Sequence, residues 1–491
     1  ITGPVTANDL GQRLKFGATV NSTGLVEGGA LVSRGGKISI VAAGNATVGG
    51  RINANAKNSG NGGNVSVKTG GDITIEATAE VSAGGAGIDG AGGDVIFYAD
   101  EKITVQDGAL FSAHGAGTGD GGFIEISGKY AQIGSARYDL GSDQGQAGSL
   151  LFDPLDLVFN AGNTNVTGGG AITLTADNSI LVASGGELNS TNGFGPAGNI
   201  SLVAPKITLA DGSIVTAGTT GNVTLMATQS TGGTAEIIIG DGTGSAPVLS
   251  GNNITLNATS TADNFSLLVS VPTATASVTI TSGTINATGA LVANARATTN
   301  GDLSTVALPI GVVVTNSSAT VDVGGTSDIT AGSVTLAARS TVTSNIPTES
   351  LAPANSAADG AVAVSTINST AIARIADAAK VVATGAIDVS AKNKVVSVAN
   401  ATPLAAAFGA SVGVSVINAI TTAELAGTAN LTAASLKLDA STATDVTVTA
   451  IAGSGGATEP SAGSKAASFL SADKYGSEAT TSEGKLSIAG A

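Results

Sequence analysis

The segment "GGNVSVK" (residues 62–68) decides how this chain folds. After its two glycines, Val65 and Val67 alternate with polar residues. Successive side chains of a strand point to opposite faces, so this alternation predicts a β-strand with one buried face. Segments of the same form are "GGKISIV" (35–41), "GGDVIFY" (92–98) and "GGFIEIS" (121–127). Their double glycines return at nearly regular intervals along the chain, about 30 residues apart, which indicates a structural repeat.

Shorter alternating segments follow and give each repeat several strands. One such unit, "KITVQDGALFSAHG" (102–115), returns much later as "KITLADGSIVTAG" (206–218). Both contain a strand, an Asp-Gly pair, a second strand and a final glycine. Glycine reaches left-handed backbone angles that other residues avoid, so the Asp-Gly pairs predict sharp turns.

A longer period occupies the C-terminal third. The segments "GVVVTNSSATVDV", "AVAVSTINSTAIARI" and "SVGVSVINAITTAEL" begin at Gly311, Ala361 and Ser411, which gives a period of about 50 residues. Each leads, at a similar distance, to a second alternating segment: "SVTLAA" (333–338), "AIDVSA" (386–391) or "SLKLDA" (435–440). We expect about two coils in each unit of this length.

Many short strands separated by Gly, Asn and Asp turns predict an all-β fold, a β-solenoid in the form of an elongated rod. Each coil pairs with the coils above and below, and inward Val, Ile, Leu and Ala form a narrow core. A β-sandwich array is the alternative, but sandwiches usually bury bulky aromatic residues, which make up only 3% of this chain. Coils of about 20–25 residues would give about twenty coils and a rod on the order of 100 Å long.

We divide the chain into four parts on these patterns. They are a Gly-rich β-helix (1–160), continuing solenoid coils (161–303), a solenoid with three repeats of about 50 residues (304–451), and further coils (452–491). The sequence shows no signal peptide and ends just after a strand-like segment, so we expect an internal piece of a longer protein.

Charge and composition argue against several classes of partner. The formal net charge of −15 disfavours nucleic acid and anionic membrane surfaces. No apolar run approaches the roughly 18 residues of a membrane-spanning helix, so we expect no membrane insertion. The chain has no cysteine, which suits a protein that crosses a membrane unfolded and folds outside.

Residues that could carry chemistry are few. His114 is the only histidine, and without neighbouring aspartates or a basic residue it is interpreted as a solvent-facing turn residue. The segments "GGAGIDGA" (84–91) and "GTGDGG" (117–122) resemble calcium-binding glycine-aspartate turns, but those turns work in tandem copies, so flexible loops are favoured. Asn-x-Ser/Thr triplets, such as the one at Asn199, have the form of glycosylation sites. In a chain so rich in Asn, Ser and Thr they arise from the composition, and we assign no site to them. No catalytic, cofactor-binding or metal-binding residue is predicted, and no cofactor; binding residues stay unassigned.

The segment "GSLLFDPLDLVFNAG" (148–162) places Asp153 and Asp156 among the most apolar residues of the chain. A catalytic pair would need converging partners, and only Leu, Phe and Gly are nearby. We therefore expect Asp153 to cap a turn between two strands by accepting backbone N–H bonds, with Pro154 fixing the turn. Phe152 and either Leu155 or Leu157 should point into the rod, because adjoining apolar residues alternate faces.

Three segments in order resemble the filamentous-haemagglutinin family of bacterial two-partner-secretion exoproteins. They are "GGNVSVKTGGDITIEATAEVSAGGAG" (62–87), "GDGGFIEISGKY" (119–130) and "AGSLLFDPLDLVF" (147–159), and the resemblance extends from the start of the chain to about position 160. It implies a right-handed parallel β-helix, adhesion, and secretion through an outer-membrane transporter that recognises a region outside this sequence.

The sequence and this resemblance together predict a non-enzymatic extracellular adhesin rod at the bacterial cell surface, associated with the outer membrane. It would mediate attachment to other cells, to biofilm matrix or to a host. The expected partners are surface glycans, exopolysaccharide or another cell surface. The alternatives are a structural filament or sheath subunit, a polysaccharide-binding or polysaccharide-degrading β-helix, and a threonine-array ice binder.

Overall fold

The computed structural model describes residues 36–160, 162–167, 170–192, 197–266, 268–303, 309–349, 358–402 and 408–451, with short strands towards both ends (5–7, 12–16, 20–22, 26–28, 479–482 and 485–488). Within these ranges every regular element is a strand. The described residues thus contain no helix long and apolar enough to cross a membrane. The predicted all-β fold is confirmed.

The strands up to residue 160 are β1 (Val5–Ala7), β2 (Gln12–Phe16), β3 (Val20–Ser22), β4 (Val26–Gly28), β5 (Lys37–Ala42), β6 (Ala46–Val48), β7 (Arg51–Asn53), β8 (Asn64–Thr69), β9 (Ile73–Ile75), β10 (Glu80–Ser82), β11 (Asp94–Val105), β12 (Leu110–Ser112), β13 (Phe123–Ile133), β14 (Arg137–Asp139), β15 (Ser149–Phe152) and β16 (Asp156–Phe159). The next are β17 (Gly162–Thr167), β18 (Ala171–Thr175), β19 (Ser179–Val182), β20 (Gly186–Asn192), β21 (Ile200–Val203), β22 (Lys206–Leu209), β23 (Ile214–Thr216), β24 (Val223–Gln229), β25 (Gly233–Ile239), β26 (Val248–Gly251), β27 (Ile254–Ser266), β28 (Val269–Ser270), β29 (Thr273–Ile280) and β30 (Thr284–Leu303). The last are β31 (Ile310–Val323), β32 (Asp328–Glu349), β33 (Ala358–Ile375), β34 (Lys380–Ala383), β35 (Ala386–Thr402), β36 (Phe408–Leu425), β37 (Asn430–Thr432), β38 (Ser435–Ile451), β39 (Ala479–Ser482) and β40 (Lys485–Ile488).

The chain winds through three parallel faces, and each strand pairs with the strand one coil earlier and one coil later. Face A runs β2–β5–β8–β11–β13–β15–β18–β21–β24–β27–β30–β32–β35–β38. Face B runs β3–β6–β9–β11–β13–β16–β19–β22–β25–β29–β31–β33–β36, and face C runs β1–β4–β7–β10–β12–β14–β17–β20–β23–β26–β30–β32–β34–β37. Long strands such as β11 and β30 bend from one face to the next. This is a β-helix-like stack.

The double glycines allow the coils of the first part to stack closely. A Cβ atom on Gly63 would overlap the carbonyl oxygen of Gly36, and one on Gly93 would overlap that of Gly63. The next glycine of the row, Gly122, stands in the same relation to Gly93. The first glycine of each pair has its own constraint, since a Cβ on Gly92 would overlap the Ala113 carbonyl. Only glycine leaves room for these backbone contacts.

The alternation predicted after each double glycine is confirmed. In β8 the side chains of Val65 and Val67 are buried and face the core, and they pair in register with Val95 and Phe97 of β11. Inward residues of successive coils therefore lie directly above one another. Five buried aromatic rings also contact one another in sequence through this part of the core, one pair stacked and the others edge to face: Phe97, Phe111, Tyr138, Phe152 and Phe159.

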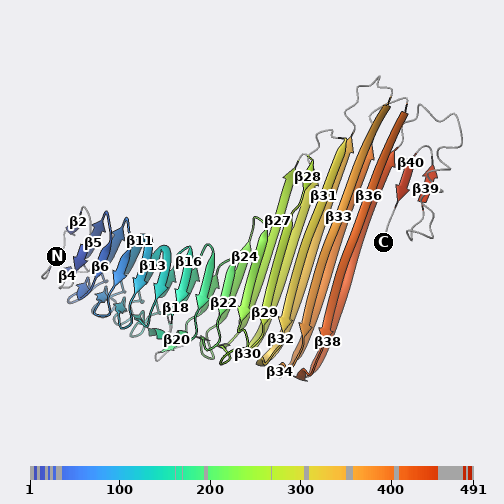
Figure 1. The fold of residues 1–491 in the computed structure, drawn as a ribbon. Coiled ribbons are helices and arrows are strands. Elements are labelled where there is room, and N and C mark those ends of the chain that lie inside the picture. Colours follow the sequence, from blue (N-terminus) through green and yellow to red (C-terminus); the bar gives the residue numbers. More distant parts are fainter. Residues whose placement is uncertain are drawn as a thin grey trace.

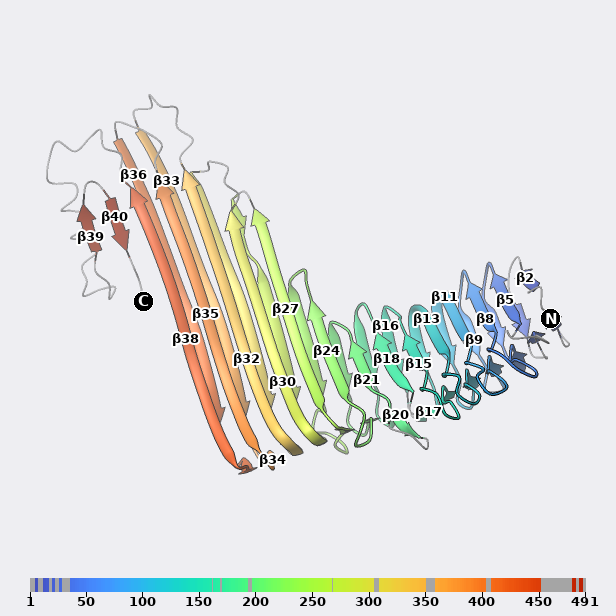
Figure 2. The ribbon, with the colours of Figure 1, turned by 180° about the vertical axis from the view of Figure 1, so that it is seen from behind.

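Coils lengthen along the stack, so that a slim N-terminal part widens into a tall C-terminal blade (Figure 1). Seen from behind, the long strands of faces A and B stand side by side and the short coils continue away from them (Figure 2). Asn64 donates to its register partner Asp94 across 30 residues of chain, whereas Arg374 donates to Asp322 across 52 residues. A strand such as β33, with 18 residues, is about 60 Å long.

Each unit of the long period is one coil, so the expectation of two coils per unit is wrong. Strand β31 pairs with β33 from Ile310 and Val362 onwards, and β33 pairs with β36 in the same way. Register partners of the first pair, such as Asn316 and Asn368, are 52 residues apart. This separation is slightly longer than the period of about 50 residues in the sequence. Because both numbers are even, the same set of side chains points inward in either register.

The stack is also shorter than expected. Face A contains fourteen strands among the described residues, a height of about 60 Å, so the estimate of about twenty coils and 100 Å was too large. Of the coils expected over 452–491, only β39 and β40 are described, and they pair antiparallel.

Small and polar residues fill the blade between faces A and B. Apolar layers alternate with two buried hydroxyl layers along the strands. In one layer Ser340 contacts Ser317 and Ser369 of the opposite face at 2.7 Å each, and Ser369 donates to Asn393 at 2.6 Å. The second layer joins four serines in the same zigzag: Ser344, Ser365, Ser397 and Ser415. Each of these serine hydroxyls thus has a hydrogen-bond partner, whereas the buried hydroxyls of Thr299 and Thr315 in the same interior have none among the described residues.

Replacing Gly93 by Ala tests the stacking of the double glycines. The added Cβ meets backbone atoms, so the coils must move apart. We therefore expect the unfolding free energy to fall by about 1–3 kcal/mol. The neighbouring substitution Asp94→Ala, on an exposed side chain, should change it by no more than about 0.5 kcal/mol. Urea denaturation followed by far-UV circular dichroism measures both. Equal stabilities of the two variants would contradict the role of Gly93.

Candidate functional site

Asp153 and Asp156 lie at a corner between faces A and B, as the strand–turn–strand interpretation predicts. Strand β15 ends at Phe152 and β16 begins at Asp156. Phe152 and Leu157 are buried in the core, which confirms their predicted inward direction. Pro154 is buried as well, beneath the exposed Asp153.

The predicted cap by Asp153 is wrong. Its carboxylate forms no hydrogen bond or ion pair with any described residue, because the corner's backbone groups bond to neighbouring coils, as when Leu155 N–H donates to Lys129 C=O at 2.9 Å. Partial burial, and then the nearby Asp177 carboxylate, raise the pKa of Asp153. Asp156 instead accepts a hydrogen bond from Asn178 at 2.9 Å and one from Ser179. The two acids therefore do not share a ligand or a partner.

The two glycine-rich loops stack on one another. Ala116 N–H donates to Gly90 C=O at 2.7 Å, and Thr118 N–H donates to Ile88 C=O at 2.8 Å. The side chain of Asp120 accepts a bond from the Gln146 N–H at 2.8 Å. In the part of the chain that the structure describes, no group of three or more His, Cys, Asp or Glu side chains could hold a metal ion.

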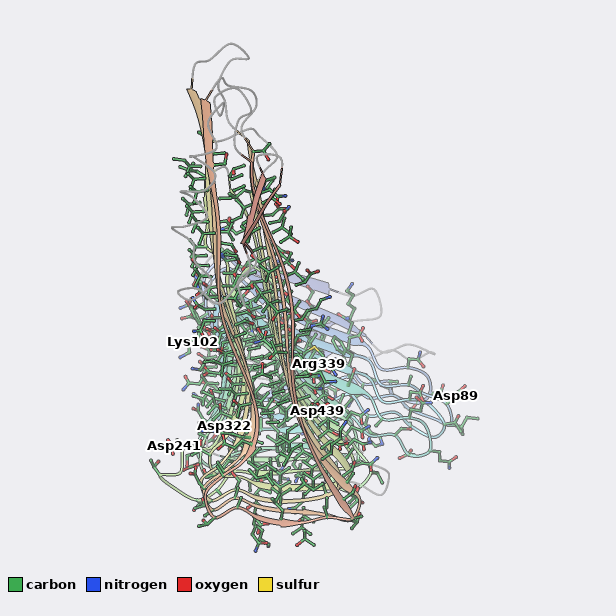
Figure 3. The ribbon with its side chains drawn as sticks, turned by 90° about the vertical axis from the view of Figure 1, so that its right-hand side faces the viewer. Asp89, Lys102, Asp241, Asp322, Arg339 and Asp439 are labelled. Carbon is green, nitrogen blue, oxygen red and sulfur yellow. The ribbon has the colours of Figure 1, made fainter. Side chains whose placement is uncertain are left out.

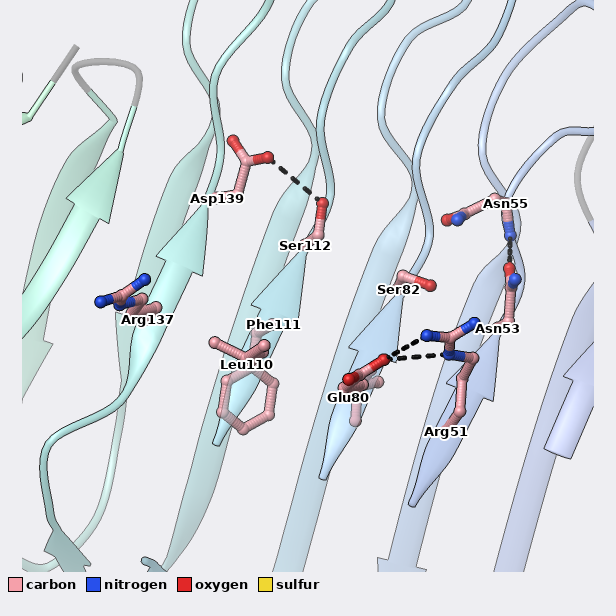
Figure 4. Close-up of a pocket in the computed structure, with 11 residues that line it drawn as sticks. Arg51, Asn53, Asn55, Glu80, Ser82, Leu110, Phe111, Ser112, Arg137 and Asp139 are labelled. Atoms are coloured by element: carbon pink, nitrogen blue, oxygen red, sulfur yellow. Dashed lines mark hydrogen bonds and ion pairs between the residues drawn. The ribbon is translucent and has the colours of Figure 1, made fainter. Parts of the chain in front are cut away.

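An open groove of about 450 Å³ crosses four coils on face C (Figure 4). Charged and polar side chains line it above an apolar floor. Arg51 of β7 forms an ion pair with Glu80 of β10, with 2.7 Å between Nη2 and Oε2. The residues that line the groove are Arg51, Asn53, Asn55, Glu80, Val81, Ser82, Leu110, Phe111, Ser112, Arg137 and Asp139.

His114 lies just after β12, beside this groove and between two carboxylates of the next coil. Its Nδ1 is 3.1 Å from Asp139 Oδ1 and its Nε2 is 3.2 Å from Asp143 Oδ1. Asp143 also accepts the Gly117 N–H at 2.9 Å, which fixes its position. The expectation that His114 has no acidic neighbours is therefore wrong, although its side chain is partly exposed to solvent.

The two carboxylates control the charge of His114. Burial, the largest effect, lowers the pKa of His114, but hydrogen bonds and charges from Asp139 and then Asp143 outweigh it and raise the pKa above 6.5. The pKa of Asp143 is lowered, first by the Gly117 N–H and then by its bond to His114. A protonated imidazole donates to both acids, so the cluster joins two coils electrostatically.

Sequence reasoning missed this cluster because Asp139 and Asp143 are 25 and 29 residues from His114. The repeat of about 30 residues was the available signal, since residues one coil apart become neighbours. With Arg137 on the same strand as Asp139, the cluster provides a proton donor, acids and a cation beside an open groove. Such groups could act on a sugar acid, or they could simply tie the coils together.

Outward-facing amides form rows across successive coils. Asn253 donates to Asn222 at 3.1 Å, and Asn222 donates to Asn199 at 3.3 Å. A second row joins Asn368 to Asn316 at 3.0 Å on face B. The triplet at Asn199 is thus part of a row of amides that also accept backbone N–H groups of the next coil. Long polar rows, not enclosed cavities, characterise the outer surface.

The fold and these open grooves define a β-helix-like protein with extended polar faces. Comparison with known proteins finds no family model, curated protein or solved structure that matches the chain.

The charge of His114 can be measured directly, because it gives the only histidine signal in an NMR titration. We expect a pKa above 6.5, and a lower pKa in Asp139→Asn and Asp143→Asn. A raised histidine pKa stabilises the fold below the ordinary pKa and loses this contribution as the pH rises through the raised value.

His114→Gln should therefore reduce the unfolding free energy by up to about 1 kcal/mol near pH 5, and by much less near pH 9, since the pair is partly exposed. A titration midpoint at or below 6.5 in the unsubstituted protein would contradict the assignment.

Proposed function

We propose that this chain is part of an extracellular bacterial adhesin of the filamentous-haemagglutinin type. In this proposal the stack is a right-handed parallel β-helix, and the protein is exported through an outer-membrane transporter. It projects from the cell surface and mediates attachment to other cells, to biofilm matrix or to a host without catalysing a reaction.

One observation carries the proposal: the described chain is a continuous parallel stack whose outer faces repeat polar side chains from coil to coil. A stack of this kind exposes a long, repeated surface and reaches far from its base. Its grooves are open and shallow, which suits the side of a long polymer better than a small molecule. The resemblance of residues 62–159 to the family supports export and adhesion.

Beads coated with the folded chain test this function. We expect them to bind biofilm-forming bacteria or their isolated matrix several-fold more than beads coated with heat-unfolded chain. Excess soluble chain should compete. Flow cytometry of fluorescent beads measures the binding. Equal binding of the folded and the unfolded chain would show that the described faces do not mediate attachment.

A polysaccharide-degrading β-helix is the second candidate, and the His114 cluster beside the face C groove is the observation that favours it. Against it, both ring nitrogens of His114 are occupied by carboxylates, which leaves neither free to take a proton from a sugar.

We therefore expect purified protein to release neither reducing ends nor unsaturated uronate from polygalacturonate. Turnover that disappears in His114→Gln or Asp139→Asn, while circular dichroism stays unchanged, would make the enzyme the better proposal.

A further inference from the structure

Several basic residues of this protein lie opposite an acid on the neighbouring coil. Four ion pairs join residues that are direct register partners: Arg51–Glu80, Lys206–Glu236, Arg374–Asp322 and Lys380–Asp328, at 2.7, 3.0, 2.7 and 3.1 Å. Residues one coil apart lie side by side. Opposite charges on adjacent coils therefore attract, and like charges repel.

Face A breaks this pattern. Arg296 of β30 pairs in register with Arg339 of β32, and Arg339 pairs with Lys392 of β35. We call these three residues the cationic row. All three side chains are exposed, and Lys394 lies two residues beyond Lys392 on the same face. Like charges directly opposite on neighbouring strands destabilise a sheet.

Acids nearby do not neutralise the row. Among the described residues, Arg296 and Arg339 form no ion pair, and Lys392 has only Asp439, at 3.8 Å, which it shares with Lys437. Two other carboxylates on this face bind amides instead. Asp263 accepts from Asn300 at 2.6 Å, and Asp302 accepts from Asn345 at 3.2 Å. The row keeps its positive charge on a chain whose formal charge is −15.

Two shallow grooves meet at Arg339, which Figure 3 shows on the flank opposite Asp322. One has a volume of about 460 Å³ and is lined by Asn257, Asn294 and Arg296, among others. The other, of about 260 Å³, is lined by Lys392 and Lys394. Asn294 donates to Asn257 at 2.9 Å, and each amide retains further donor or acceptor capacity for a ligand.

We propose that the cationic row of face A binds an acidic polysaccharide that lies along the stack, across the strands. The row spans about 10 Å, with one cation at each strand spacing of about 4.8 Å. A sugar ring is comparable in length with that spacing, so carboxylates on a linear chain can meet successive cations while ring hydroxyls bond the amides. This proposal rests on the adhesin function and names its ligand class.

Nucleic acid fits the same surface less well. Duplex DNA carries one charge per about 1.7 Å, so an acidic protein repels it far more than a glycan with at most one charge per sugar. Single strands bind largely by stacking on aromatic side chains, and no aromatic residue lines either groove.

Polygalacturonate is the probe for the experiment, with neutral dextran and a single-stranded oligonucleotide as comparisons. Biolayer interferometry on the whole chain should show salt-sensitive binding of polygalacturonate and none of dextran. The triple variant Arg296→Gln, Arg339→Gln, Lys392→Gln should bind about tenfold more weakly or worse, since each exposed ion pair contributes a factor of about two to five. Arg339→Lys, which keeps the charge, should retain most of the binding.

A matched control removes three paired cations elsewhere: Arg51→Gln, Lys206→Gln and Lys380→Gln. It changes the net charge equally and should weaken binding less than about twofold. Equal losses in both triple variants, no loss in the face A variant, or tighter binding of the oligonucleotide would each overturn the proposal. Circular dichroism confirms that each variant is folded.

The bead assay separates this proposal from the adhesin function. If beads coated with the face A variant still bind cells as well as unsubstituted chain, the adhesin proposal stands and the cationic row is not its site. If the unsubstituted chain binds polygalacturonate through the row but no cell or matrix, the site stands and the adhesin function fails.

Discussion

In-register parallel pairing between neighbouring coils is the interaction on which the rest of the structure depends. It places every side chain about 4.8 Å from the side chain one coil away, so each row must hold residues that tolerate their own kind or complement each other. Val, Ile and Ala occupy the inward rows, and amides that hydrogen-bond to one another occupy some of the outward rows. Glycine rows such as Gly63 and Gly93 are needed where backbones approach too closely for a Cβ. Several charged residues follow the same rule as ion pairs, whereas the cationic row places like charges side by side, and for this row we propose an acidic polysaccharide as the partner.

The side chains that fill the core differ between the short coils and the long ones. Near the N-terminus three faces enclose a core wide enough for stacked aromatic rings such as Phe111 and Tyr138, whose centroids are 5.0 Å apart. In the blade, faces A and B approach each other, and small residues fill the space. The buried serine layers cost desolvation, but their hydroxyls bond across the two faces, as Ser340 does with Ser317 and Ser369. A shift of either face by two residues would leave these groups opposite apolar side chains, so the layers specify the alignment of the faces.

Local sequence patterns were sufficient for the strands but not for the neighbours of a site. The double glycines and the alternation predicted β5, β8, β11 and β13, because both features act within a few residues. The length of a late coil was misjudged, because strands of 17–22 residues such as β32 and β35 are far longer than usual. Asp153 does not cap the turn, because the neighbouring coils already bond the corner's backbone groups, and the local sequence gives no sign of this. The acids beside His114 and the cations beside Arg339 became neighbours only through the register, which the sequence period indicates only approximately.

Cross-linking between coils tests the central claim, that one unit of the long period is one coil. The chain has no cysteine, so two introduced thiols report a single pair. Thr320 and Ile372 are register partners on the outer side of face B, whereas Asn345 lies on face A, about half a unit beyond Thr320 along the chain. A short thiol-specific cross-linker, read by mass spectrometry, should join Thr320→Cys to Ile372→Cys efficiently and leave the pair Thr320→Cys and Asn345→Cys unlinked. Efficient linkage of the second pair without the first would show two coils per unit and contradict the register of the whole blade.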